Sequence, residues 1–376
     1  MPIPCQRHLF DIPDEVAYFN CAYMSPLLRA AREAGERAVG RKSRPWTIRP
    51  PDFFDLPAET RELFARLIGA APGDIALVPA VSYGMSIAAR NTPLGPGRRV
   101  LLLAGEFPSA VYPWLTRARE TGAEPVLLPR PDDADWTRVV LEAIDERTAA
   151  AVLPHLHWTD GALLDLVRIA ARLREVGAVL ALDLTQSLAA LPLDLAAVAP
   201  DWLVAAGYKW LLTPYSIGLM YVAPKRQDGR PLEETWIARE GSEDFSTLVN
   251  YRDRYQPGAR RYDVGEPPNF ALLPAANAAL RQLLDWGVPA IQETLSALTD
   301  AIVSRTAPLG FRAVPRERRA GHYLGLRREG GLPPGLADRL ARAEVYASVR
   351  GDALRVTPHL YNNSADIDRL VAVLAR

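Results

Sequence analysis

Short apolar runs alternate with longer amphipathic segments from about residue 60 to residue 225, and this alternation constrains the fold most. A short apolar run bounded by turn residues indicates a buried strand, whereas a helix that covers a sheet has one apolar face. Strands that alternate with helices favour a mostly parallel sheet with helices on both faces. The predicted strands are 75–79, 99–103, 125–128, 149–153, 179–182, 202–205 and 218–222. The helices predicted between them include 84–91, 110–121, 136–144 and 163–176.

The rest of the chain predicts a second, smaller domain of the α+β class. Residues 226–268 are polar and irregular, and we interpret them as a connection with an exposed or interface role. Two helices are expected over 275–286 and 288–306, short strands near 322–326, 346–350 and 353–356, and a closing helix over 366–374 with Ser364 as its cap. We expect an N-terminal segment of residues 1–30 that joins the small domain, a large domain of residues 31–255 and a small domain of residues 256–376.

Composition and charge narrow the classes of function. A chain of 376 residues that is 49% hydrophobic and 23% charged can bury a large core in two domains. Lysine plus arginine and aspartate plus glutamate are equal at 44 each, so the charge does not indicate nucleic acid or a membrane as a partner. The first residues lack a secretory pattern, no apolar stretch could span a bilayer, and Cys5 and Cys21 form neither a disulfide framework nor a CxxC motif. We expect a cytoplasmic protein.

A lysine and an aspartate each follow a predicted buried strand. Lys209 ends the run Ala206-Gly207-Tyr208-Lys209, and Asp183 ends an apolar run of small residues and leucines. Strand-end lysines are common, so Lys209 alone would be explained as a side chain that reaches solvent. With Asp183 at the same edge of the sheet, we favour a site for pyridoxal phosphate, in which the lysine forms a Schiff base and the aspartate keeps the ring nitrogen protonated.

Two further segments follow strands of the same sheet. Ser82 and Tyr83 lie where a strand passes into a helix, a position that suits a phosphate because free backbone N–H groups and the helix dipole point at it. When that segment is taken alone, an ordinary serine cap is the better explanation. Phe107 follows the next strand and could stack on a flat cofactor, although a core phenylalanine is the simpler explanation without its neighbours.

Histidine and arginine supply candidates on the substrate side. His155 and His157 form an HxH pair, but no convincing third ligand accompanies them, so we expect no metal site. His157 or Trp158 could face the cofactor or the substrate, and a structural histidine is an equal alternative. Arg355 lies in a short apolar strand, where a buried guanidinium needs an anion, either a substrate α-carboxylate or an internal acid.

Together these segments resemble the class V aminotransferase-like enzymes of pyridoxal phosphate fold type I. That group includes aminotransferases, cysteine desulfurases, kynureninases and isopenicillin N epimerase-like proteins. The likeness runs from Tyr18-Phe19-Asn20-Cys21-Ala22 to Tyr361-Asn362-Asn363. It implies an α/β fold with a large domain built on a mostly parallel seven-stranded sheet, a smaller α+β domain, and a homodimer with active sites at the subunit boundary.

The resemblance also implies a role for each candidate residue. Lys209 carries the cofactor and moves the proton, and Asp183 pairs with the ring nitrogen. The other cofactor-binding side chains are Gln186 at the ring hydroxyl, Ser82 and Tyr83 at the phosphate, Phe107 on the ring face and Tyr208 beside the lysine. The substrate-binding residues are Arg355, Asn20, His157 and Trp158.

Two departures from the group's pattern matter for function. Cysteine desulfurases carry a nucleophilic cysteine shortly before the carboxylate-binding arginine, and residues 344–354 contain none, so persulfide chemistry is not expected. Glu266 occupies the place of a threonine that reaches the partner subunit's phosphate in many members, and a carboxylate would repel that phosphate. Asn269 is a substitute candidate.

Several functions fit these features. The leading hypothesis is an aminotransferase or lyase that acts at Cα or Cβ of an amino acid or related amine through a Schiff base (aldimine) on Lys209. An epimerase or racemase of the same fold is an alternative within this class. A non-catalytic relative is disfavoured because both Lys209 and Asp183 are present, and a metal hydrolase that uses His155 and His157 is disfavoured by the missing third ligand.

Overall fold

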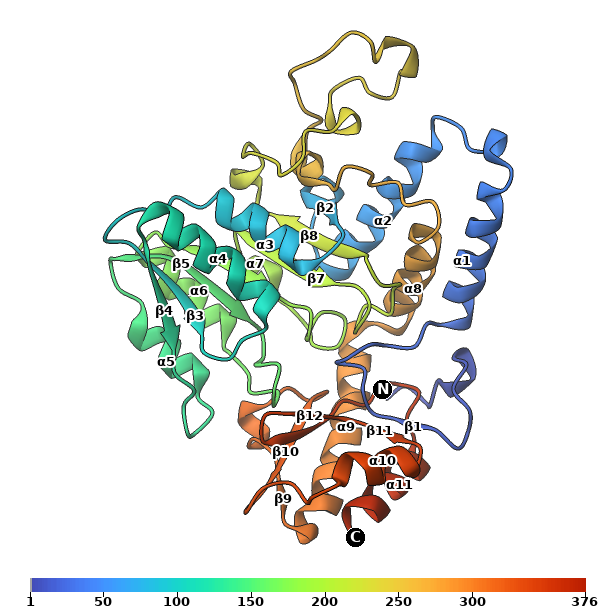
Figure 1. The fold of residues 1–376 in the computed structure, drawn as a ribbon, viewed down its shortest axis with the longest axis vertical. Coiled ribbons are helices and arrows are strands. Elements are labelled where there is room, and N and C mark those ends of the chain that lie inside the picture. Colours follow the sequence, from blue (N-terminus) through green and yellow to red (C-terminus); the bar gives the residue numbers. More distant parts are fainter. Residues whose placement is uncertain (1) are drawn as a thin grey trace.

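A seven-stranded sheet forms the centre of the larger domain in the computed structural model, which describes residues 2–376 (Figure 1). Its strand order is β2-β8-β7-β6-β5-β3-β4, and β8 is antiparallel to both neighbours while the others run parallel. The strands are β2 Ile75–Val78, β3 Arg99–Leu103, β4 Glu124–Leu128, β5 Thr148–Pro154, β6 Val179–Asp183, β7 Trp202–Ala206 and β8 Gly218–Val222. The predicted fold class is confirmed, since each predicted strand is present and the ends differ by a residue or so.

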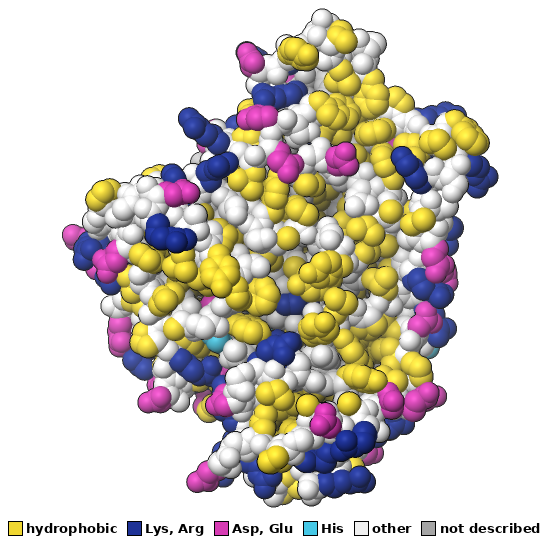
Figure 2. Space-filling model, viewed as in Figure 1, with side chains coloured by type: hydrophobic (Ala, Val, Ile, Leu, Met, Phe, Trp, Pro, Cys, Tyr) yellow, Lys and Arg dark blue, Asp and Glu magenta, His cyan; other side chains and the backbone are white. Residues whose placement is uncertain are grey.

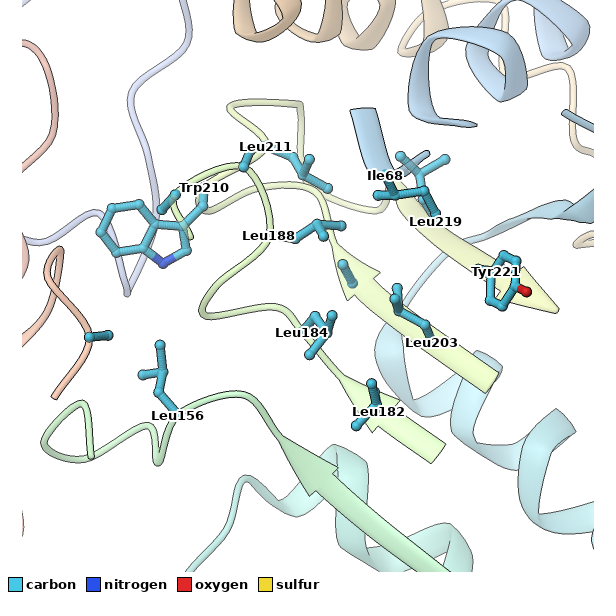
Figure 3. Packing of buried hydrophobic residues seen from close by; sticks show 14 of the residues in the cluster. Ile68, Leu156, Leu182, Leu184, Leu188, Leu203, Trp210, Leu211, Leu219 and Tyr221 are labelled. Atoms are coloured by element: carbon cyan, nitrogen blue, oxygen red, sulfur yellow. The ribbon is translucent and has the colours of Figure 1, made fainter. Parts of the chain in front are cut away.

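Both faces of this sheet are apolar because successive side chains of a strand point to opposite sides. Leu182, Leu203 and Leu219 project from three neighbouring strands into one cluster (Figure 3), whereas Val204 and Met220 belong to the cluster on the other face. Helices α3 Val81–Arg90 and α4 Pro108–Thr121 cover the second face. Helices α2 Asp52–Ile68, α5 Trp136–Ala143, α6 Leu166–Glu175 and the short α7 Leu195–Val198 cover the first.

The smaller domain lies below the sheet domain in Figure 1 and is built around a second sheet. Its strand order is β12-β13-β10-β9, with β9 Phe311–Arg312, β10 Leu324–Arg328, β12 Ser348–Arg350 and β13 Ala353–Val356. Helices α9 Val288–Thr306, α10 Leu336–Arg342 and α11 Ser364–Leu374 complete it. The N-terminal segment contributes β1 Ala17–Tyr18, which pairs in parallel with β11 Val345–Tyr346. None of the helices within residues 2–376 is long and apolar enough to cross a membrane.

The cap of the last helix differs from the prediction. Asn363, not Ser364, is the N-cap of α11, and its side chain accepts a hydrogen bond from the Asp366 N–H at 3.1 Å. The Asp366 carboxylate accepts one in return from the Asn363 N–H, which completes a capping box. The prediction of Ser364 is therefore wrong, because an asparagine one residue earlier already reaches the free N–H groups.

The domain division near residue 256 stays a prediction, and the packing favours a later boundary. Helix α8 Leu273–Trp286 packs against α1 Arg29–Lys42 and α2, and its buried side chains join the core cluster of the large sheet. The long helix α9 then passes into the smaller domain.

The 226–268 connection contains only short 3-10 turns within its length and is tied back to the sheet at its end. Asp263 forms a buried ion pair with Arg61 of α2 and accepts a hydrogen bond from the Leu77 N–H of β2 at 2.8 Å. Before this anchored end, the gold segment in Figure 1 extends away from the top of the molecule. The chain's 3-10 turns are Arg7–Leu9, Pro45–Thr47, Pro72–Asp74, Pro224–Arg226, Trp236–Ala238, Phe245–Thr247, Gly258–Tyr262, Ala307–Leu309 and Arg316–Arg318.

Asp263→Ala should lower the free energy of unfolding by roughly 3–5 kcal/mol, because it leaves the Arg61 guanidinium buried without its partner. Urea denaturation followed by tryptophan fluorescence measures the change. Asp368→Ala removes the acid of an exposed pair with Arg305 and should cost less than about 1 kcal/mol. Equal losses in the two variants would contradict a structural role for the buried pair.

Candidate functional site

A cavity of about 330 Å³ lies at the carboxyl ends of the parallel strands, and the residues that line it belong to the sheet domain. In the space-filling view the smaller domain lies below the sheet domain (Figure 2). Parallel strands all end at one edge of a sheet, so the segments after β3, β5, β6 and β7 meet there. The structure brings most of the predicted site residues to this cavity: Ser82, Phe107, Trp158, Asp183, Gln186, Tyr208 and Lys209.

Lys209 lies just beyond β7 and is buried. Its Nζ lies 5.2 Å from the centre of the Phe107 ring and 5.7 Å from that of Tyr208. Burial lowers the pKa of Lys209 to about 8; Arg355 adds to this fall, and Asp183 opposes it. At pH 7 about a tenth of the side chain is therefore the neutral amine, which is the form that attacks a carbonyl.

Asp183 is the last residue of β6 and is also buried. Its Oδ1 accepts a hydrogen bond from the Thr185 N–H at 3.0 Å. Burial raises the pKa of Asp183, while the Thr185 hydrogen bond and Lys209 oppose the rise. A buried carboxylate is stable when a positive group faces it, and the protonated ring nitrogen of pyridoxal phosphate fits this requirement.

The N-terminus of α3 also lines the cavity. Ala80 is the N-cap residue, no side chain caps the helix, and Ala80, Val81 and Ser82 all line the cavity. The free N–H groups at this end are available to a phosphate, so Ser82 does not act as an ordinary cap. Tyr83 is not brought to the cavity, because its ring packs against the apolar cluster under the sheet.

Aromatic rings also form part of the cavity wall. Phe107 and Trp158 meet edge to face with ring centres 5.6 Å apart, and the Trp158 indole donates a hydrogen bond to the Gly105 carbonyl at 2.8 Å. Tyr208 packs on Tyr215 with ring centres 4.4 Å apart. These contacts fix flat surfaces beside Lys209, as a planar cofactor requires.

Gln186 lines the cavity, and its side-chain amide already forms two hydrogen bonds within the protein. Its Nε2 donates to the Ala22 carbonyl at 3.2 Å, and its Oε1 accepts from the Trp210 indole at 3.2 Å. An amide nitrogen has two N–H donors, so one remains for a ring hydroxyl. That contact with the cofactor stays a prediction.

Arg355 is almost completely buried, with 2% of its surface exposed, and faces the Trp158 ring at 6.0 Å. Tyr323 lies close enough for Arg355 to lower the pKa of its hydroxyl, and this hydroxyl donates to the Trp158 carbonyl. Within residues 2–376 no carboxylate lies within 4.0 Å of this guanidinium, and its Nε has no hydrogen-bond partner. The alternative of an internal acid as the partner is thus not observed, and an external anion fits better.

Four other candidates lie away from the cavity. His157 stacks on Trp136 at 5.2 Å, and its ring nitrogens contact the Thr159 hydroxyl and the Ala104 carbonyl. Asn20 accepts a hydrogen bond from the Ser348 hydroxyl at 2.9 Å. Glu266 is exposed and Asn269 bonds to the Leu272 N–H, and neither lines the cavity. No group of three potential metal ligands occurs among residues 2–376.

Glu106 is the site residue that the sequence argument missed. It lines the cavity, its Oε1 accepts from the Phe107 N–H at 2.6 Å, and its Oε2 is shielded without a hydrogen-bond partner. Burial raises the pKa of Glu106 to about 8, and Asp183 adds to the rise. Its place after β3 was the available signal, because an acid at a strand's carboxyl end reaches the same edge as Asp183.

Comparisons with known proteins agree with the predicted family and fold. The family model "Aminotransferase class-V" matches residues 49–370. An uncharacterized aminotransferase of Bacillus subtilis, YcbU, is 27% identical over 328 residues, which cover 84% of this chain and 82% of that protein. Isopenicillin N epimerase of Streptomyces clavuligerus is 27% identical over 370 residues, or 91% of each chain. The crystal structure of the cysteine desulfurase CsdA from Escherichia coli shares the fold with a TM-score of 0.82 at 20% identity, covering 98% of this chain and 96% of that one.

Cofactor-free protein mixed with pyridoxal phosphate should gain its covalent absorbance band faster as the pH rises to about 8 and then no faster, because the neutral Lys209 amine is the nucleophile. Stopped-flow absorbance measures this rate. Nα-acetyllysine in solution, which keeps its free ε-amine, is the control, and its rate should keep rising to about pH 10. A protein rate that follows the same curve as the control would show that Lys209 is not perturbed.

Proposed function

We propose that this chain, which belongs to the class-V aminotransferase family, uses Lys209 to act at Cα or Cβ of an amino acid or a related amine. The family makes it a pyridoxal-phosphate-dependent enzyme of the aminotransferase or lyase type, as the sequence predicted. The single observation that carries the proposal is a buried, partly neutral lysine that shares one cavity with a buried aspartate.

Each residue then has a defined task. Pyridoxal phosphate, when bound, would supply an electron-withdrawing group for the substrate carbon next to the amine. Asp183 keeps the ring nitrogen protonated, and the uncapped start of α3 holds the phosphate. The Lys209 Nζ removes and returns the proton at Cα. Arg355 orients the substrate because its fork matches a carboxylate with two parallel hydrogen bonds.

Desulfuration is not the reaction we propose. Residues 344–354, which precede Arg355, contain no cysteine. Cys21 is buried and burial raises the pKa of its thiol, so it is not a ready nucleophile. Cys5 is exposed and lies against the Tyr361 carbonyl at 3.5 Å, outside the cavity lining.

Epimerisation is the second candidate because Glu106 offers another proton-transfer group. A pyridoxal phosphate enzyme that inverts Cα needs a proton acceptor and a proton donor, and Glu106 lines the cavity beside Lys209. Its shielded Oε2 lacks a hydrogen-bond partner, so it can carry a proton. The isopenicillin N epimerase of Streptomyces clavuligerus is among the relatives of this chain.

We also propose that the protein works as a cytoplasmic homodimer. Two observations support a second copy as the partner: the 226–268 connection is long for a surface loop, and it carries apolar side chains into solvent. Tyr251 is 98% and Val249 80% exposed at this extension. Cys5 and Cys21 are both free thiols, as expected in a reducing compartment.

Lys209→Ala should abolish turnover of amino acids and the borohydride-sensitive absorbance band, because no other amine is placed to hold the cofactor. Purified wild-type protein incubated with single amino acids distinguishes the reaction classes. A keto acid with the pyridoxamine form indicates transamination, a released side-chain fragment indicates a lyase, and exchange of the α-hydrogen with inversion indicates an epimerase. Full activity in Lys209→Ala would refute the proposal.

Sedimentation should give twice the mass of one chain for the wild-type protein. Tyr251→Glu should weaken the dimer at least tenfold, because a charge would replace an apolar contact. Val167→Glu makes the same change on an exposed valine of α6 and should leave the mass unchanged. A fully active monomer at micromolar concentration would contradict the homodimer.

A further inference from the structure

A second arginine lies on the same face of the small sheet as Arg355. In the antiparallel pair β12–β13, Ser348 is opposite Arg355 and Arg350 is opposite Ala353. Residues opposite each other, and residues two apart on one strand, point to the same face. Arg350 is therefore the diagonal neighbour of Arg355, at about 7–8 Å between backbones, within reach of two long side chains.

Neither guanidinium is neutralised by the protein. Arg350 is half-buried, and its one hydrogen bond, 2.8 Å long, goes to the neighbouring Val349 carbonyl. Among residues 2–376 no acid lies within ion-pair distance of Arg350 or Arg355. Burial lowers the pKa of Arg350, and the nearby charge of Arg355 lowers it further.

The acids nearest to this face already have partners. Asp160 packs against Gly325, the residue opposite Arg355 on β10, but its carboxylate pairs with Arg130 and Arg327. Asp352 pairs with Arg327 at 2.9 Å. The uncompensated positive charge on this face is therefore a property of the site, and an anionic ligand would relieve it.

We propose that the substrate carries a second carboxylate in its side chain, which binds Arg350 while Arg355 binds the α-carboxylate. This inference rests on the proposed function, because it takes Arg355 as the anchor of an amino acid substrate. Tyr23 lies near Arg350 and offers a hydroxyl donor beside the second anion. The hydroxyl of the other neighbouring tyrosine, Tyr323, is already donated to the Trp158 carbonyl. A dicarboxylic amino acid fits this arrangement, and a substrate with an apolar side chain would leave Arg350 unpaired.

The test uses cofactor-loaded protein and unreactive acids at about 0.15 M salt. Calorimetry gives the dissociation constants of glutarate and adipate, and of valerate as a monocarboxylate. The wild-type protein should bind the better dicarboxylate about tenfold more tightly than valerate, the size expected for one further hydrogen-bonded charge pair. Arg350→Gln should remove that advantage and leave valerate binding within about twofold, whereas Arg355→Gln should weaken all three acids.

Arg328→Gln is the matched control, since it removes an exposed arginine at the end of β10 and changes the net charge equally. It should leave every dissociation constant within about twofold. Equal binding of valerate and the dicarboxylates in the wild-type protein, or an equal loss in Arg328→Gln and Arg350→Gln, would overturn the assignment of a second carboxylate. Absence of a borohydride-sensitive band in the wild-type protein would instead overturn the proposed function itself.

Discussion

The burial of Lys209 beside Asp183 is the interaction on which the rest of this structure depends. Ionisable groups are rarely buried, because loss of hydration is costly unless a partner compensates it. Here they lie where four parallel strands end, and the apolar clusters on both faces of the sheet hold these ends rigidly. The free energy gained by those clusters offsets the cost of a site that is poorly satisfied by the protein alone.

The charges around the cavity make physical sense once ligands are included. Asp183 favours a cation as its partner, and the free N–H groups at the uncapped start of α3 favour an anion. Lys209 is suited to react with a carbonyl group. Pyridoxal phosphate offers all three in one planar molecule, with a protonated nitrogen, a phosphate and an aldehyde. The rings of Phe107 and Trp158 then supply the flat surface between the charged ends.

Sequence patterns predicted the strands well because β3, β5, β6 and β7 are apolar on both faces, which gives continuous runs that end abruptly at the site. Lys209, Asp183 and Phe107 were found for the same reason, since each lies at the end of such a run or a few residues beyond it. The pattern of apolar and polar residues does not indicate which way a side chain points beyond the end of a strand. For this reason Tyr83 and His157 were expected at the site, whereas their rings pack into the core instead. The sequence likewise could not show that Arg355 lacks an internal acid, because partners such as Asp160 come from distant segments.

The two domains contribute different parts of the chemistry. In the proposed function, the sheet domain supplies Lys209 and Asp183, which line the cavity and hold the cofactor, whereas the small domain supplies Arg355 and Arg350, on the paired strands β13 and β12, for the substrate carboxylates. Asp160 links the two domains, because this residue of the large domain forms an ion pair with Arg327 on β10, the strand next to that of Arg355. Its carboxylate thereby satisfies Arg327 and leaves Arg355 free for a ligand. Under the proposed roles, reaction type depends on the strand ends of the sheet domain and substrate choice on one hairpin of the small domain, so the two can vary independently on this fold.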